Sequence, residues 1–229
     1  LLLAFLGDEK YGLWATLLSV INWINYFDVG IGNGLRNLLS KEIAEDEKEG
    51  AQKSVSTAYT IISAIAFVVF VALLISVFAL DWKTIFSTAI DMKWPLLISF
   101  AFICINFILA LSNTLLYALQ KSERVSIRAC LVQIINLVGV LLLGRLIDGS
   151  LVAMAVLFGM STLVVYLYNT VHIFAKYDYL RPSIVFFERC KIRQICDVGI
   201  KFFAIQIFCL MLFTVDNLLI THFFGAAEV

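Results

Sequence analysis

The stretch Ser54–Leu80, SVSTAYTIISAIAFVVFVALLISVFAL, decides the fold because it runs for 27 residues without an Asp, Glu, Lys or Arg. A helix needs roughly 20 apolar residues to cross the hydrocarbon of a bilayer, so this stretch predicts a membrane span. Trp94–Gln120 and Gly149–Ala175 lack these charged residues over the same length, and Ala129–Gly144 lacks them over 16 residues. The chain therefore carries several candidate spans in series.

Two further segments, Tyr11–Leu35 and Phe202–Ala227, are each interrupted by a single charged residue, Asp28 and Asp216. A carboxylate at the centre of a membrane helix costs about 2.5–3.5 kcal/mol on insertion scales, so these aspartates need a reason to be there. The composition, with 62% hydrophobic and 15% charged residues and a mean hydropathy of +0.95, is far from that of a soluble domain. We predict an all-α, polytopic membrane protein.

The basic residues are distributed unevenly between the predicted loops. Three alternate loops carry 13 of the 17, and the opposite side of the membrane receives the other four. Under the positive-inside rule the basic loops face the cytoplasm, and so does the N-terminus. The net charge is zero, which gives no indication of a nucleic-acid partner. The charge-rich segment Ser40–Lys53 is expected to be a solvated amphipathic helix.

The two ends of the chain resemble each other. Leu1–Gly7 is too short to span and reads as the outer end of a truncated first span, and it resembles Leu219–Gly225, six spans later. An even number of spans per repeat predicts parallel repeats, a common transporter plan. We therefore expect a fragment of a transporter with two bundles and twelve or more helices: the first six-helix bundle and the first helix of the second.

The expected organisation has three parts. Residues 1–175 form the first bundle, with a truncated first span and spans at about 11–35, 55–80, 94–119, 129–147 and 150–175. Residues 176–201 form a cytoplasmic linker, and residues 202–229 form the first span of the second bundle.

Polar residues share one face of the segment 11–35 and its continuation. At about 100° per residue they fall within one arc, with Asp28 on its flank, although alternate glycines after residue 29 favour a kink or a close approach of a neighbouring helix. Hydrogen bonds between helices would explain some of these side chains, whereas a dense arc favours a water-filled cavity. The residues of this face are Asn22, Asn25, Tyr26, Asp28, Asn33, Arg36 and Asn37.

A second polar stripe follows the segment 94–120, where Ser99, Asn106, Asn113 and Gln120 are seven residues apart. Residues at this spacing lie on one face of a helix. Gln133 and Asn136 repeat the pattern, and Gln206 and Asn217 share a face, with Asp216 adjacent. Amides in this setting suit a ligand rich in hydroxyl groups, whereas a small inorganic ion would require carboxylate or carbonyl clusters. The five cysteines show no metal-ligand spacing.

Three segments together resemble the polysaccharide-transport family of the multidrug/oligosaccharidyl-lipid/polysaccharide exporter superfamily. They are Phe5-Leu6-Gly7 followed by Tyr11-Gly12-Leu13-Trp14, then Phe27-Asp28-Val29-Gly30-Ile31-Gly32-Asn33-Gly34-Leu35-Arg36-Asn37, and Val215-Asp216-Asn217-Leu218-Leu219-Ile220 leading into Phe224-Gly225-Ala226. The resemblance covers the chain from end to end, and the Gly-Leu-Arg-Asn segment is its most specific part.

The resemblance implies a flippase in the bacterial inner membrane that moves undecaprenyl-diphosphate-linked oligosaccharides outward by alternating access, for O-antigen, other lipopolysaccharide, capsule or teichoic-acid-like polymers. It implies partners among membrane lipids, lipid-linked oligosaccharides and other polysaccharide assembly proteins, with proton or cation coupling as one source of driving force. By analogy a central cavity would be lined by the charged and amide residues above, with Arg36 contacting diphosphate. The candidate residues are Asn22, Asn25, Asp28, Asn33, Arg36, Asn37, Asn106, Asn113, Asp216 and Asn217.

Other functions remain open at this point. A drug/cation antiporter is expected to cluster acids in one bundle, and a peptidoglycan-precursor flippase is expected to have a more cationic cavity. A membrane glycosyltransferase or polymerase usually places its acid or Arg/His clusters in large external loops, which are short here, and a scaffold without transport would not need the polar faces. We therefore expect no enzyme, no catalytic residue, no metal site and no cofactor.

Overall fold

The computed structural model describes residues 2–25, 30–86 and 88–224, with the side chains of residues 20–25 and 210–224 left out of the description. Over these residues the chain is 86% helical and contains no strand, which confirms the all-α prediction. Among these residues, four apolar helices are long enough to cross a membrane: α4 (Lys48–Ala79), α6 with α7 (Lys93–Leu109 and Leu111–Ala118), α8 (Ser122–Leu146) and α9 (Leu151–Lys176). These helices coincide with the four long uncharged segments of the sequence.

The remaining elements are shorter or contain more charged residues. Helices α1 (Leu2–Leu6) and α2 (Asp8–Asn25) open the chain, α3 (Ile31–Ala44) precedes α4, and α5 (Trp82–Ile85) is a single turn after it. Two 3₁₀ turns, Asp178–Leu180 and Ile184–Phe186, lead from α9 into α10 (Arg189–Phe224). That the first bundle has six membrane-spanning helices, and that the whole transporter has two bundles, remain predictions.

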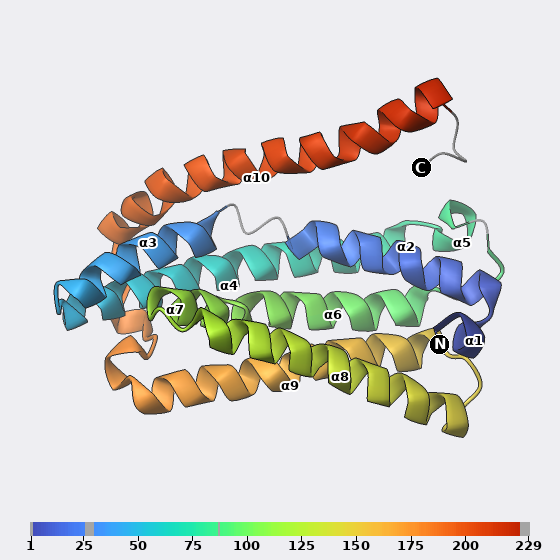
Figure 1. Ribbon diagram of the computed structural model, residues 1–229, viewed down its shortest axis with the longest axis horizontal. Helices are drawn as coiled ribbons and strands as arrows, with labels where there is room; N and C mark the ends of the chain where they lie inside the picture. Colours follow the sequence, from blue (N-terminus) through green and yellow to red (C-terminus); the bar gives the residue numbers. More distant parts are fainter. Residues whose placement is uncertain (1, 26–29, 87, 225–229) are drawn as a thin grey trace.

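The helices lie roughly side by side along one long axis (Figure 1). Helix α6 packs against α4 and α9, α8 packs against α9, and α3 packs against α4, α7 and α10. Residues 177–188 cross one end of the bundle, which we call the linker end; the loop 147–150 and α5 lie at the opposite end (Figure 1).

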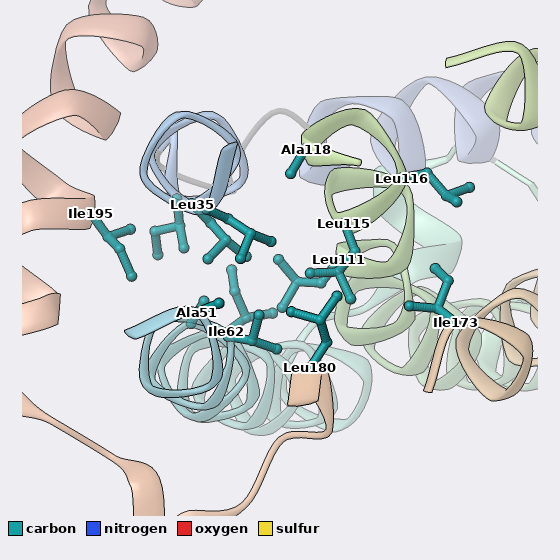
Figure 2. Close-up of a cluster of buried hydrophobic side chains, with 14 residues drawn as sticks. Leu35, Ala51, Ile62, Leu111, Leu115, Leu116, Ala118, Ile173, Leu180 and Ile195 are labelled. Atoms are coloured by element: carbon teal, nitrogen blue, oxygen red, sulfur yellow. The ribbon is translucent and has the colours of Figure 1, made fainter. Parts of the chain in front are cut away.

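Two apolar clusters fill the bundle, one near each end. The first contains Leu35, Ala51, Ile62, Leu115 and Ile195, among others, and joins α3, α4, α7 and α10 (Figure 2). The second joins α1, α2, α4, α6, α8 and α9. Burial of such side chains contributes roughly 1.5–3 kcal/mol each in water, whereas in a bilayer close packing supplies more of the stabilisation.

Glycines determine how α3 begins and how α10 packs on it. Gly30 has a φ of +73°, a conformation that residues with a Cβ rarely adopt, and α3 starts at the next residue. A Cβ on Gly30 would lie 2.0 Å from the carbonyl oxygen of Gly199, and one on Gly34 would lie 2.1 Å from that of Ile195. Backbone therefore meets backbone where α3 and α10 touch.

The segment after α9 is fastened to α4 by hydrogen bonds. The backbone amide of Ser183 donates to the Ser56 hydroxyl over 3.1 Å, and that of Glu188 donates to the Thr57 hydroxyl over 3.1 Å. At the same end Lys121 donates a hydrogen bond to the Tyr177 hydroxyl, which lowers the pKa of this phenol below its ordinary value.

Glu42 is buried, whereas the sequence predicts a solvated helix over Ser40–Lys53. Its side chain is buried, with a residue exposure of 2%, and it accepts hydrogen bonds from Lys191 Nζ at 2.5 Å and from the Ser54 hydroxyl at 2.8 Å. The prediction was wrong at this position because α10 returns to the end of α3 and covers it. The neighbouring Lys41 and Glu45 are exposed as expected.

Candidate functional site

A cavity of about 630 Å³ lies inside the bundle, at mid-height of α6, α8 and α9. It is bounded by side chains of both apolar clusters, Trp14 and Ile103 of one, Ile62 and Leu111 of the other. Its polar lining consists of hydroxyl and amide groups from four helices: Ser99, Asn106, Thr114, Gln133, Asn136, Thr162 and Tyr166. The rest of the printed lining is apolar, so the cavity is a mostly apolar space that carries a set of polar groups.

Helix α6 supplies two polar side chains that lack full hydrogen bonding. Ser99 and Asn106 are seven residues apart and both face the cavity. The Ser99 hydroxyl is buried without a partner, as is Oδ1 of Asn106, whose amide nitrogen donates to the Gly159 carbonyl over 3.3 Å. A buried polar atom without a partner costs about 1–3 kcal/mol, so these atoms need a partner from the cavity.

Helices α8 and α9 face the same space with paired groups. Ser161 donates a hydrogen bond to Oδ1 of the buried Asn136, and this bond joins α9 to α8. Thr162 donates to the Phe158 carbonyl over 3.1 Å, as hydroxyl side chains in apolar helices commonly do. These pairs fix one wall, while Gln133 and Tyr166 complete the polar lining.

Trp14 closes the cavity on the side of α2. Its ring is buried and meets Phe158 edge to face, with ring centroids 5.2 Å apart. The indole N–H is buried without a partner. An aromatic ring with an unpaired N–H group, next to amide and hydroxyl groups, can bind neutral, hydroxyl-rich molecules or ordered water.

Among the residues whose side chains the structure describes, those that line the cavity carry no formal charge, since none of them is Asp, Glu, Lys or Arg. Among the residues that the structure describes, no group of three His, Cys, Asp or Glu is placed to hold a metal ion. The cavity can therefore donate and accept hydrogen bonds through Trp14, Ser99 and Asn106, which have buried polar atoms without a partner among the described lining residues.

The model of the polysaccharide biosynthesis protein family matches residues 1–229. The chain belongs to this family. Comparisons with curated proteins and with solved structures found no similar protein. The family-level resemblance inferred from the sequence is therefore confirmed, and the cavity is a feature of a polysaccharide biosynthesis protein.

In this polysaccharide biosynthesis protein, the predicted stripe on residues 94–120 is divided between two environments. The helix is interrupted at Ala110, where α6 passes into α7. Asn106 lines the cavity, whereas Asn113 accepts a hydrogen bond from Asn169 of α9 over 3.3 Å. Asn169 also donates to Ser112 over 3.0 Å, so this second cluster joins helices.

The candidates on α3 lie outside the cavity. Asn33 is partly buried, and Arg36 and Asn37 are exposed. The Arg36 guanidinium lies over the Tyr117 ring of α7, 4.9 Å from its centroid, and Asn37 donates to the Asn33 carbonyl over 3.0 Å. These residues form a polar face of α3 that the structure does not bring together with Asn106.

Five predicted site residues cannot be placed. Asp28 lies outside the described residues, and the side chains of Asn22, Asn25, Asp216 and Asn217 are not described. The backbones of the last four belong to α2 and α10.

Sequence reasoning missed the contribution of α9. Ser161 and Thr162 are adjacent, and Tyr166 and Asn169 follow at intervals of four and three residues, which places all four along one side of a helix. This spacing was a signal in the sequence, comparable with the stripe on α6. Its importance depends on α9 packing against α6, a contact between helices distant in sequence.

Proposed function

We propose that this polysaccharide biosynthesis protein is part of an exporter that moves lipid-linked oligosaccharide units across the bacterial inner membrane by alternating access. The observation that carries the proposal is a cavity inside a bundle of apolar helices, with hydroxyl and amide groups and no charged side chain among its described lining residues. Neutral amides and an aromatic ring suit sugar hydroxyls, and family membership supplies the link to polysaccharide.

The same lining favours transport over an enzymatic role. Amide and hydroxyl groups bind a ligand well but are weak proton donors and acceptors at neutral pH without an activating base. A cavity of about 630 Å³ also falls in the range of small-molecule binding sites, so it has room for a sugar residue or for the water that hydrates one.

The polar face of α3 has a separate role in this proposal. Arg36 is exposed and held over Tyr117, which leaves guanidinium N–H groups available for a diphosphate, because a ring face contacts only the plane of the guanidinium. We place Arg36 at the mouth of the translocation path, at the linker end, which the positive-inside rule assigns to the cytoplasm. Asp28 and Asp216 are proposed to line the same path.

Gene deletion in the host tests the proposal. Loss of the surface polymer together with accumulation of lipid-linked units on the cytoplasmic face is the expected result. Unchanged polymer with increased drug sensitivity would favour a drug/cation antiporter, and arrest of peptidoglycan synthesis would favour a peptidoglycan-precursor flippase. Normal export with a polymer of altered length would favour a polymerase.

Complementation then tests the residues. Asp28→Asn and Arg36→Ala are expected to restore export poorly, at no more than about a tenth of the wild-type level, because each removes a charge from the proposed path. Arg189→Ala, which removes an exposed arginine at the start of α10, is the matched control and should restore export fully. Membrane abundance is measured for every variant. Equal export by all three variants would show that Asp28 and Arg36 are not needed for transport.

A further inference from the structure

A second cavity opens on the outer surface of the bundle, between α8 and α9, near the linker end. Its volume is about 420 Å³, and none of its lining residues is shared with the interior cavity. In Figure 1, α8 and α9 lie on the side of the bundle away from α10. The lining combines three nitrogen-bearing side chains, Arg124, Arg128 and His172, with apolar neighbours such as Ile127, Leu131 and Val164.

Arg128 is the residue that requires an explanation. Its exposure is 8%, and its Nη1 atom is buried without a hydrogen-bond partner. Among the residues that the structure describes, no carboxylate forms a salt bridge with it. Burying an unpaired charge is costly, so a guanidinium in this position needs an anion that is not part of the described chain.

The neighbouring side chains increase the positive character of the groove. Arg124 Nη1 lies 3.4 Å from His172 Nε2, and the His172 ring stacks on Tyr168 with centroids 6.1 Å apart. Among the described residues, the carboxylate that forms a salt bridge with these side chains is that of Glu123, which is mostly exposed and 3.9 Å from Arg124 Nε. Two arginines with one weakly held carboxylate leave the groove cationic.

The position of the groove limits what the anion can be. Arg128 is about 9 Å along α8 from its first residue, at 1.5 Å per residue. With the start of α8 at the membrane surface, this distance places Arg128 at the depth of the lipid headgroups and the adjoining chain region. Beside it, Ile127, Leu131 and Val164 are exposed, as are apolar residues farther along both helices. An anion with an apolar chain would satisfy both the arginines and this surface.

We propose that the groove between α8 and α9 binds the phosphate headgroup of a membrane lipid, whose chain lies along the exposed apolar face of the two helices. Arg128 and Arg124 contact the phosphate oxygens, because guanidinium groups match them in geometry and charge. Basic pockets between membrane helices on the cytoplasmic side hold lipid headgroups by this chemistry. The proposal depends on membrane insertion and not on the cargo that the protein transports.

Native mass spectrometry of the detergent-purified protein tests the proposal. Phosphatidylglycerol is the probe, and diacylglycerol with the same chains is its phosphate-free match. Wild-type protein should retain phosphatidylglycerol but not diacylglycerol. Arg128→Gln should weaken phosphatidylglycerol binding by about tenfold or more, as expected for the loss of a charge-assisted hydrogen bond, whereas Arg145→Gln, at the other end of α8, should leave binding within about twofold.

Two further experiments complete the test. The first distinguishes a lipid phosphate from free phosphate, and the second provides another variant in case Arg128→Gln does not fold. Inorganic phosphate in large excess should fail to displace the lipid, and displacement would show a site for a free anion instead. If Arg128→Gln does not fold, Arg124→Gln, whose side chain is partly exposed, should weaken binding by about threefold or more. Equal retention of both lipids, or equal retention by wild type and both variants, overturns the proposal.

Discussion

At the scale of single residues, Glu42 shows how a charge can be structural in a membrane protein. Its carboxylate accepts from Lys191 and Ser54 and is almost fully covered. The surrounding sequence is rich in Lys and Glu, so local pattern indicates a solvated surface. The burial of Glu42 results from α10 packing on α3, a contact between residues about 150 positions apart, which no local pattern encodes.

Replacing Lys191 should therefore destabilise the protein strongly. Lys191→Met leaves Glu42 buried and uncompensated, and we expect a loss of about 3 kcal/mol of unfolding free energy. The double variant Glu42→Leu with Lys191→Met should recover most of that loss, because no unpaired charge remains. Chemical denaturation in detergent measures both effects, with the exposed Lys201→Met as control. Equal stability of the single variant and the wild type would contradict this assignment.

The Oδ1 atom of Asn106, which has no hydrogen-bond partner, leads to a prediction about transport. Asn106→Leu removes a polar atom from the interior cavity and one hydrogen bond to the Gly159 carbonyl, so stability should change by no more than about 1 kcal/mol. If the cavity binds cargo, export should fall at least tenfold at unchanged membrane abundance. Ile105→Leu, one residue away and exposed to the outside, is the control. If Asn106→Leu exports at the wild-type level, the cavity does not bind the transported molecule through Asn106.

At the scale of elements, the contact between α3 and α10 depends on glycine. Alternate glycines in the sequence favoured either a kink or a close approach of a neighbouring helix, and the structure shows the close approach, since Gly30 and Gly34 meet the backbone of α10. The partner helix could not be identified from the sequence. Gly199 is an isolated glycine in α10, and its role becomes visible only when the two helices are placed together.

Alanine at these glycines should separate the helices. Gly34→Ala places a Cβ within 2.1 Å of the Ile195 carbonyl oxygen, so α10 must shift, and we expect a loss of about 1–3 kcal/mol. Gly12→Ala is a matched control in α2, where a Cβ meets nothing within 4 Å, and it should be neutral or stabilising by up to about 1 kcal/mol. Thermal unfolding compares the two, and equal melting temperatures would argue against close packing of α3 on α10.

At the scale of the whole molecule, the sequence predicts the hydrophobic architecture well and the interior poorly. Uncharged segments are sufficient to identify α4, α6 with α7, α8 and α9, because crossing a bilayer imposes a length and a composition on each helix separately. Which polar residues meet inside depends on rotation and packing, as the separation of Asn106 from Asn113 shows. The stripe predicted as one face divides at the interruption between α6 and α7.

Orientation in the membrane is a prediction at this scale that labelling can check. In a variant that keeps Cys190 as its one cysteine, a membrane-impermeant maleimide should label only after the cells are permeabilised, because the basic linker end is predicted to be cytoplasmic. With Asp148→Cys as the one cysteine, at the opposite end, intact cells should be labelled. The reverse pattern would invert the topology.

The glycine contact also has a mechanical consequence for α10. This helix has 36 residues and is about 54 Å long at 1.5 Å per residue, yet its contact with α3 lies near its beginning, at Ile195 and Gly199. At this contact Gly34 and Gly30 of α3 meet the backbone of α10, so a tilt of α10 would turn about this point. A tilt of roughly 10° at Gly199 would swing Phe224, about 25 residues farther on, through about 6–7 Å. Small rearrangements at the linker end would thus become large displacements at the other face of the membrane.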